Sequence, residues 1–227
     1  MADRPIAFST PMVQALLREI AKPGTGKTQT RRMIQPQPER TGNGNWHIHN
    51  RHGGSVLATA LEGPEELAEV AATQLTYLSP PWEPGDRAWV REGLKRVVVK
   101  GMPVVSYAAD ATELIDEGLH SGWAWKPSAL AGRYMPRWAN RITLHITDVR
   151  VHRLQDITPD DCRAEGHPMA PKNLYPQEVH DDAARDWYMD LWGDLHGGPE
   201  SWRSNPWVYA LTFVPELAHI DNARSAP

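Results

Sequence analysis

The chain has 227 residues, of which 24 are Lys or Arg and 28 are Asp or Glu, so its formal net charge is −4. This mild acidity argues against a protein that coats nucleic acid through charge alone, although it allows a local basic pocket. The single cysteine excludes an internal disulfide, and the apolar runs are far shorter than the ~20 residues of a membrane span. The amino-terminal residues lack the basic-then-apolar order of a signal peptide, so we expect a cytoplasmic protein.

The first elements form a strand–helix–strand segment. A short apolar run at 6–9 predicts a strand, and Thr10-Pro11 has the N-cap and first-turn residues of a helix. Apolar residues at helical spacing continue this helix to about residue 20, where Pro and Gly follow. Residues 29–34 then predict a second strand, which ends before Pro36.

A Gly- and His-rich segment, 36–75, interrupts the chain after this strand. It predicts a loop or small hairpin followed by a short helix at 64–72. We interpret it as an insertion into a single domain that covers residues 1–216, with a flexible tail at 217–227.

The second half predicts several strands and two helices. Strands are expected at 87–92, 95–99, 104–108, 141–154 and 206–214, with a turn at 101–103. Thr158-Pro159 starts a short helix that ends near Gly166, and a longer helix follows at 177–195. Its expected buried stripe is Val179, Ala183, Trp187, Leu191 and Leu195. This order favours an α+β, mainly β fold, a small β-barrel with peripheral helices.

Two patterns point to chemistry that their surroundings do not support. Gly24-Thr25-Gly26-Lys27-Thr28 resembles part of a phosphate-binding loop, but the first Gly of that motif is replaced by Ala21 and a helix precedes it. His47, His49 and His52 suggest a metal site, but no Cys or carboxylate nearby completes a tetrahedral set. We therefore expect no metal and no cofactor.

The segment Lys27-Thr28-Gln29-Thr30-Arg31-Arg32 has the highest density of reactive side chains. In an extended strand, Thr30 and Arg32 share one face and Arg31 lies on the other. A Thr hydroxyl becomes a nucleophile when a base removes its proton, and a Lys serves as that base only if burial favours its neutral form. On spacing alone, ordinary basic residues on a surface strand remain the alternative.

The order of these pieces resembles the ASCH superfamily, whose fold is like that of PUA domains. The resemblance covers most of the chain outside 36–75 and the tail. Within the superfamily, the chain is most similar to a phage or prophage branch. Its residues are the Lys27 segment, Pro84-Gly85-Asp86, Trp89-Val90-Arg91-Glu92, Met135-Pro136-Arg137-Trp138-Ala139, the strand at 141–154, Thr158 through Gly166, and Asn205-Pro206-Trp207-Val208.

Small enzymes of this superfamily hydrolyse N(4)-acetylcytidine, and the resemblance implies the same chemistry here. It implies that Thr30 attacks the amide carbonyl, that Lys27 transfers protons, and that Glu165 holds or tunes the lysine. It further implies that backbone N–H groups of the loop at 24–27 stabilise the oxyanion. The expected substrate is an N4-acylated cytosine nucleoside or a nucleic acid that carries the modified base, in the host cytoplasm if the chain is phage-encoded.

Further residues near this segment are expected to contact the substrate, and two of them are aromatic rings on which a base could stack. They are Gly26, Thr28, Arg31, Arg32, Trp89, Arg91, Glu92 and Trp207. Two alternatives from the same fold stay open: a non-catalytic protein that binds RNA or modified bases, and a ribonuclease. A membrane partner is not expected.

Overall fold

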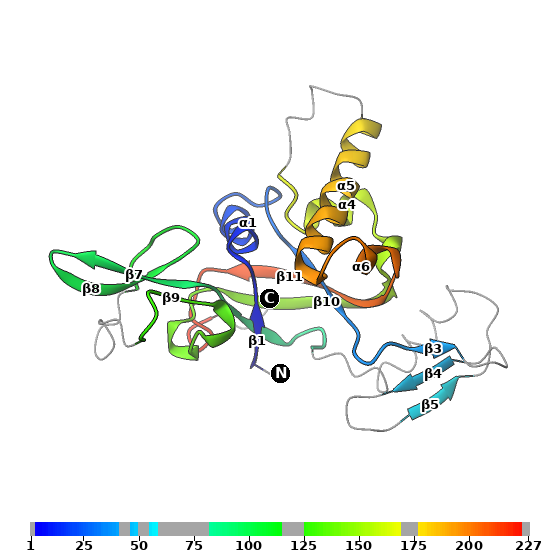
Figure 1. Ribbon diagram of the computed structural model, residues 1–227, viewed down its shortest axis with the longest axis horizontal. Helices are drawn as coiled ribbons and strands as arrows, with labels where there is room; N and C mark the ends of the chain where they lie inside the picture. The colour runs from blue at the N-terminus through cyan, green and yellow to red at the C-terminus, as the bar shows by residue number, and fades with distance from the viewer. Residues whose placement is uncertain are drawn as a thin grey trace. The chain divides into compact units, whose positions relative to one another are not determined.

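The computed structural model describes residues 3–40, 46–49, 55–58, 82–114, 125–168 and 177–223. The chain divides into two compact units. Unit 1 comprises Met1–Thr28, Gly85–Ile146 and Val214–Pro227, and unit 2 comprises Gln29–Pro84 and Thr147–Phe213. Each unit is thus assembled from segments that are distant in the sequence (Figure 1).

A mixed five-stranded sheet has the order β1-β6-β10-β11-β2. β1 pairs with β6 in parallel, whereas β6 pairs with β10 and β2 pairs with β11 in antiparallel orientation. The strands are β1 (Asp3–Ala7), β2 (Gln29–Met33), β6 (Arg87–Arg91), β10 (Thr143–Arg153) and β11 (Trp207–Glu216). The sequence therefore locates each of these strands to within a few residues.

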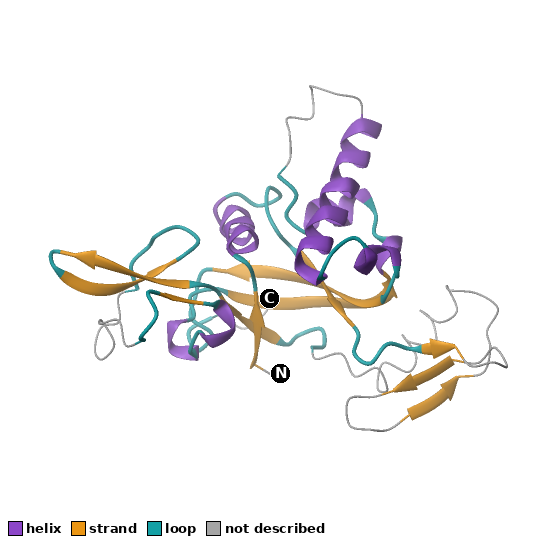
Figure 2. Cartoon of the chain, viewed as in Figure 1, coloured by secondary structure: helices purple, strands orange, loops and turns teal. Residues whose placement is uncertain are grey.

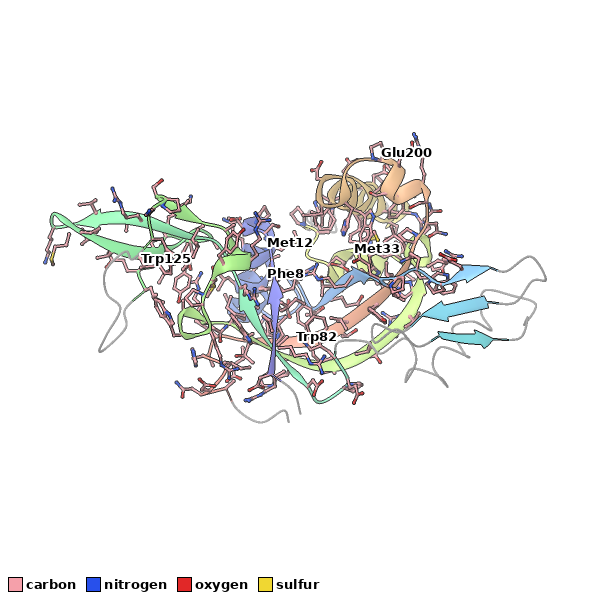
Figure 3. All side chains as sticks on the ribbon, turned by 60° about the horizontal axis from the view of Figure 1, so that its bottom comes forward. Phe8, Met12, Met33, Trp82, Trp125 and Glu200 are labelled. Atoms are coloured by element: carbon pink, nitrogen blue, oxygen red, sulfur yellow. The ribbon has the colours of Figure 1, made fainter. Side chains whose placement is uncertain are left out.

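In unit 1, helix α1 (Thr10–Ala21) follows β1 directly, and its buried residues include Met12 and Leu16. Figure 3 shows Phe8 and Met12 together at the start of this helix. A second sheet has the order β8-β7-β9, formed by β7 (Leu94–Val99), β8 (Met102–Tyr107) and β9 (Ala129–Leu130). Two short 3-10 helices follow, η1 (Gly132–Tyr134) and η2 (Arg137–Ala139).

The core of this part of unit 1 closes the base of the β7–β8 hairpin. It consists of Leu94, Val105, Tyr107, Leu130, Met135 and Ala139. The rings of Trp125 and Trp138 stack beside it with centroids 6.3 Å apart. These tryptophans fill space where phenylalanine would be common, as the composition suggests.

In unit 2, three helices pack against one another (Figure 2) and contribute to a second core. The helices are α4 (Pro159–Ala164), α5 (Gln177–His196) and α6 (Glu200–Arg203), and η3 (Leu154–Asp156) precedes them. The core residues are Leu154, Ile157, Cys162, Ala184, Tyr188, Trp192, Trp202 and Val208. A three-stranded antiparallel sheet, β3 (Glu39–Arg40), β4 (Trp46–His49) and β5 (Ser55–Ala58), occupies part of the predicted insertion.

The buried stripe expected for α5 is correct only in part: Trp187 and Leu191 are partly buried against the core, whereas the fully buried face lies one residue further along. Val179 and Leu195 are 51% and 50% exposed, while Ala184, Tyr188 and Trp192 form the buried face. Because Trp187 and Tyr188 are adjacent large rings, the sequence offers two i, i+4 stripes, and packing against Trp202 and α4 selects the second.

The α+β class is confirmed, and the expected barrel closure is not found among the described residues, where β1 and β2 are the ends of the five-stranded order. The predicted helix at 64–72 lies outside the described residues. The predicted flexible tail from 217 is wrong in its first part, since Ile220 is fully buried and its N–H donates to Asn140 Oδ1 at 2.8 Å. No helix in the described part of the chain is long and apolar enough to cross a membrane.

Candidate functional site

The loop after α1 is organised around a carboxylate from its own helix. Glu19 accepts hydrogen bonds from the backbone N–H groups of Gly24, Thr25 and Gly26, at 2.8–3.1 Å. The N–H of Lys27 donates to the carbonyl of Ala15 at 3.1 Å. The expected role of these N–H groups in stabilising an oxyanion is therefore wrong for this arrangement, because internal acceptors occupy them.

Gly26 is explained by the same packing. A Cβ at Gly26 would lie 2.2 Å from the carbonyl oxygen of Ala15, which is backbone and cannot move aside locally. Gly24 supplies the left-handed turn, with φ of 81°. Gly26 therefore lets the loop pass close to α1, and this close approach accounts for it without a contact to substrate.

Lys27 is 1% exposed at the end of this loop. Its ammonium lies 5.6 Å from the centre of the Phe8 ring, and Phe8 donates its backbone N–H to the carbonyl of Arg91. A buried lysine carries a large desolvation cost, which is most often tolerated where the group has a function. The structure thus gives Lys27 the burial that a lysine base requires.

Thr30 and Arg31 lie in unit 2 on β2, where they face Leu211 and Ala210 of β11 in register. Both are 2% exposed, so neither side of the strand is open at this point. Thr28 is half-buried just before the strand. The interpretation of this segment as surface decoration is therefore wrong.

Glu165 is the C-cap residue of α4 and is 3% exposed. Its Oε1 accepts a hydrogen bond from Nη1 of Arg31 at 3.1 Å. The Nη2 of Arg31 lies 2.9 Å from Oδ2 of Asp161, an ion pair whose angle falls outside that of a hydrogen bond. Arg31 thus brings together Glu165 and Asp161, 134 and 130 positions further along the chain. We call these three residues the Arg31 cluster.

In this cluster, the charged forms of Arg31 and Asp161 stabilise each other. Burial alone would lower the pKa of Arg31, but Glu165, Tyr188 and Asp161 outweigh it and raise the pKa. Burial would raise the pKa of Asp161, but Arg31 and a hydrogen bond from Arg150 hold it below its usual value. The cluster therefore keeps a carboxylate charged inside unit 2.

Burial also shifts the pKa of two other groups beside this cluster, Cys162 and Arg32. Burial raises the pKa of the Cys162 thiol to about 12, so this cysteine is not a thiolate nucleophile near neutral pH. Burial also lowers the pKa of the half-buried Arg32, against the attraction of Glu165 and Tyr188. Thr30 remains the nucleophile candidate on β2.

The expected base-stacking rings are both buried. Trp89 is 7% exposed, and the Arg91 guanidinium lies 5.0 Å from its centre. Trp207 is 1% exposed, with the Arg153 guanidinium 4.4 Å from its centre. A stacking platform needs an open ring face, so these rings serve packing in the structure described.

Glu92 and Arg91 belong to unit 1, and both have internal partners. Glu92 is 1% exposed and accepts two hydrogen bonds from Arg141, each of 2.8 Å. Arg141 also binds Asp110, and its guanidinium lies 3.7 Å from the centre of the Tyr107 ring. Arg91 donates to the carbonyl of Arg133 at 2.7 Å. We call Arg141, Glu92 and Asp110 the Arg141 cluster.

Sequence reasoning missed Asp161, Glu19 and Arg141 as members of these clusters. Asp161 had a visible signal, because it closes a capping box in which its N–H donates to Thr158 Oγ1 at 3.1 Å. Arg141 had none, because Glu92 and Asp110 lie 49 and 31 positions away and only the folded chain brings them near. Glu19 is only five to seven positions from the N–H groups that it binds, but its spacing carries no motif that would have identified it.

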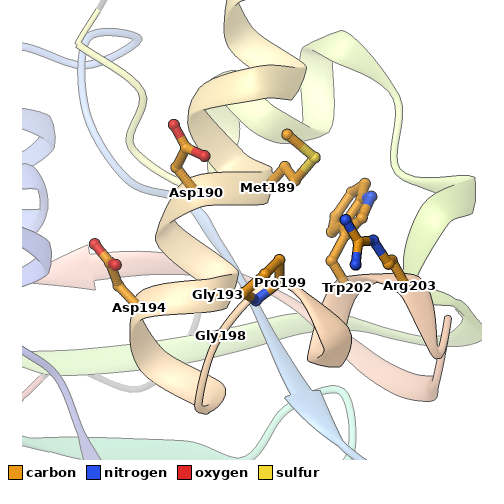
Figure 4. Close-up of a pocket in the computed structure, with 8 residues that line it drawn as sticks. All are labelled: Met189, Asp190, Gly193, Asp194, Gly198, Pro199, Trp202 and Arg203. Atoms are coloured by element: carbon orange, nitrogen blue, oxygen red, sulfur yellow. The ribbon is translucent and has the colours of Figure 1, made fainter.

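One cavity of unit 2 lies apart from every predicted site residue. It has a volume of about 500 Å³ and is bounded by α5, α6 and the turn between them (Figure 4). Its lining residues are Met189, Asp190, Gly193, Asp194, Gly198, Pro199, Trp202 and Arg203. None of the candidate catalytic residues contributes to it.

The chain was compared with protein-family models, with curated proteins and with solved structures, and no match was found in any of the three. The argument for a function therefore depends on the residues themselves.

Proposed function

We propose that this protein is an amidohydrolase of N4-acylated cytosine nucleosides and an ASCH-type, PUA-like protein. The observation that carries the proposal is the burial of its three polar candidates: Lys27, Thr30 and Glu165 are 1%, 2% and 3% exposed. Their order along the chain follows the amidohydrolase pattern, and buried polar groups of these types are uncommon without a function.

In the proposed reaction, the neutral amine of Lys27 removes the proton of Thr30 Oγ1. The oxygen attacks the acyl carbon, the bond between carbon and N4 breaks, and Lys27 returns the proton to N4, so that cytidine leaves. Water then attacks the Thr30 ester with Lys27 as base, which releases the carboxylic acid and restores the hydroxyl.

Glu165 has a distinct role in this scheme. Held by Arg31 at the end of α4, it presents a fixed negative charge that stabilises the protonated lysine formed during each transfer. The oxyanion donors must come from outside the loop at 24–26, because Glu19 occupies its N–H groups.

The test is the release of cytidine from N(4)-acetylcytidine by the purified full chain, followed by chromatography. We expect Lys27→Ala and Thr30→Val each to lower kcat by at least a hundredfold, in the range of general-base and nucleophile losses of about 10²–10⁴. Lys22→Ala is the matched control, because it removes the same side-chain type at an exposed position nearby and should leave the rate unchanged. Mass spectrometry should detect an acyl group on Thr30 during turnover.

The proposal fails if the wild-type protein releases no cytidine, or if Lys27→Ala releases it equally fast. The non-catalytic alternative relied on Trp89 and Trp207, and their burial gives it no support. No observation on the described residues favours a ribonuclease.

A further inference from the structure

The β7–β8 hairpin of unit 1 extends beyond the core that closes its base. The register from Leu94↔Tyr107 to Val99↔Met102 is continuous, and β9 covers only Leu94 and Lys95 (Figure 1). Beyond Arg96 the hairpin is a two-stranded ribbon. Lys100 and Gly101 close it with φ of 51° and 82°, as in a tight type I′ turn. The predicted turn at 101–103 is thus displaced by one residue.

This ribbon concentrates positive charge in an acidic protein. Residues 94–107 contain Lys95, Arg96 and Lys100 and no acidic residue, although the whole chain has a net charge of −4. All three cations are exposed, and among the described residues no carboxylate pairs with them. They have no internal role in the described structure.

The cations are distributed around the ribbon. Because side chains alternate along a strand, Lys95 lies on one face and Arg96 on the other, while Lys100 is at the tip. A flat anionic surface would meet only one face. A groove with phosphates along both walls would meet both.

The ribbon also exposes apolar side chains between these charges. Val98 and Met102 are 64% and 67% exposed. Val98 pairs with Pro103, and Met102 pairs with Val99. In a groove, such side chains contact the thymine methyl group and other apolar parts of base edges.

We propose that this ribbon, residues 95–104, binds double-stranded DNA in the major groove. The B-DNA major groove is about 12 Å wide and admits a two-stranded ribbon, whereas the major groove of an RNA helix is too narrow. Lys95, Arg96 and Lys100 contact phosphates, while Val98 and Met102, which lie on opposite faces of the ribbon next to its tip, contact base edges on either side of the tip. The proposal concerns residues outside the Lys27 segment, so it stands or falls independently of the proposed hydrolase activity.

The test is fluorescence anisotropy of the full chain with a labelled 20-base-pair DNA duplex at 50 and 200 mM salt. We expect Lys95→Gln/Arg96→Gln/Lys100→Gln to weaken binding at 50 mM at least tenfold. Its slope of log K against log salt should fall by about 3, since each phosphate contact contributes about 0.9. The control Arg4→Gln/Lys22→Gln/Arg203→Gln changes the net charge equally at exposed positions elsewhere and should bind like wild type.

Lys100→Asn provides a second variant, because Asn suits the left-handed turn position and keeps the hairpin intact. It should lower the salt slope by about 1 with no loss of thermal stability. The proposal is overturned if wild type does not bind the duplex at 50 mM salt, or if the control triple variant loses as much affinity. Tighter binding to duplex RNA, single strands or phosphatidylserine vesicles than to duplex DNA would also overturn it.

Discussion

The protein contains two arginine–carboxylate clusters, one in each unit, and they differ in how completely the arginine is bound. In the Arg141 cluster, two carboxylates accept four hydrogen bonds from the guanidinium, and its face lies on Tyr107. In the Arg31 cluster, Glu165 and Gln29 accept hydrogen bonds from Nη1, while Nε has no hydrogen-bond partner among the described residues.

This difference in the hydrogen bonding of the two arginines indicates which cluster has a structural role and which is a candidate for a functional one. A cluster in which every guanidinium nitrogen has a carboxylate partner costs little and needs no other explanation, so Glu92 is a structural residue rather than the expected substrate contact. A buried donor left without a partner costs about 1–3 kcal/mol, which makes the Arg31 cluster the better candidate for a functional region. Glu165 belongs to that cluster.

The largest expected effect is on stability. Arg31→Met removes the cation that the buried carboxyl groups of Glu165 and Asp161 share, which should cost about 3–5 kcal/mol. Arg141→Met should cost less, about 2–3 kcal/mol, because water reaches the 32% exposed side chain of Asp110. Urea denaturation of both variants at pH 7 measures the difference. A larger loss for Arg141→Met would reverse the ranking of the two clusters.

The next effect separates the clusters by activity. Arg31→Lys keeps the positive charge but loses the planar guanidinium whose two terminal nitrogens contact Glu165 and Asp161. The kcat for N(4)-acetylcytidine should therefore fall about tenfold, which corresponds to about 1.4 kcal/mol. KM should change little, since Arg31 acts through Glu165. Arg141→Lys is the matched control and should retain wild-type kcat. Equal losses in the two variants would assign Arg31 a purely structural role.

The pH dependence of stability should have opposite signs in the two clusters. The folded pKa of Asp161 is lowered, so its contribution is complete above its ordinary value and is lost as the pH falls through the folded value. Burial raises the pKa of Glu92 despite its hydrogen bonds from Arg141, so its contribution is complete in acid and is lost as the pH rises through the folded value.

Asp161→Asn should therefore cost less stability at pH 3 than at pH 7, whereas Glu92→Gln should cost more at pH 3 than at pH 7. Urea denaturation at both pH values measures each change. The same direction of change in both variants would contradict the assignment of the two carboxyl groups.

Sequence patterns located most strands because local alternation and turn residues determine them. The cap of α4 was equally visible, since Thr158, Pro159 and Asp161 are neighbours in the chain. The partners of Arg31 were not visible, because the cluster joins β2 to α4 across more than a hundred residues. Lys27, Thr30 and Glu165 were identified by resemblance, and their burial is a feature that only the folded chain reveals.

Two errors have a common physical origin. From the sequence, we expect the backbone N–H groups of the loop at 24–27 to be available to a ligand. In the structure, the carboxylate of Glu19 accepts hydrogen bonds from the N–H groups of Gly24 to Gly26. The α5 stripe has two possible phases, and tertiary packing buries Tyr188 fully and Trp187 only in part. In both cases the local sequence allows more than one partner, and the folded geometry decides between them: a local turn for Glu19 and tertiary packing for α5.

The smallest expected effect tests whether the Arg141 cluster depends on the Tyr107 ring or on its hydroxyl. The hydroxyl donates to the carbonyl of Ala139 at 2.9 Å, and burial raises its pKa above the usual value, so it remains a donor. Tyr107→Phe removes this bond but keeps the ring under Arg141, and it should cost about 1 kcal/mol in urea denaturation. Tyr107→Leu also removes the cation–π contact and should cost about 1–2 kcal/mol more. If the two variants lose equal stability, the ring does not support the guanidinium, and the Arg141 cluster is held by its hydrogen bonds alone.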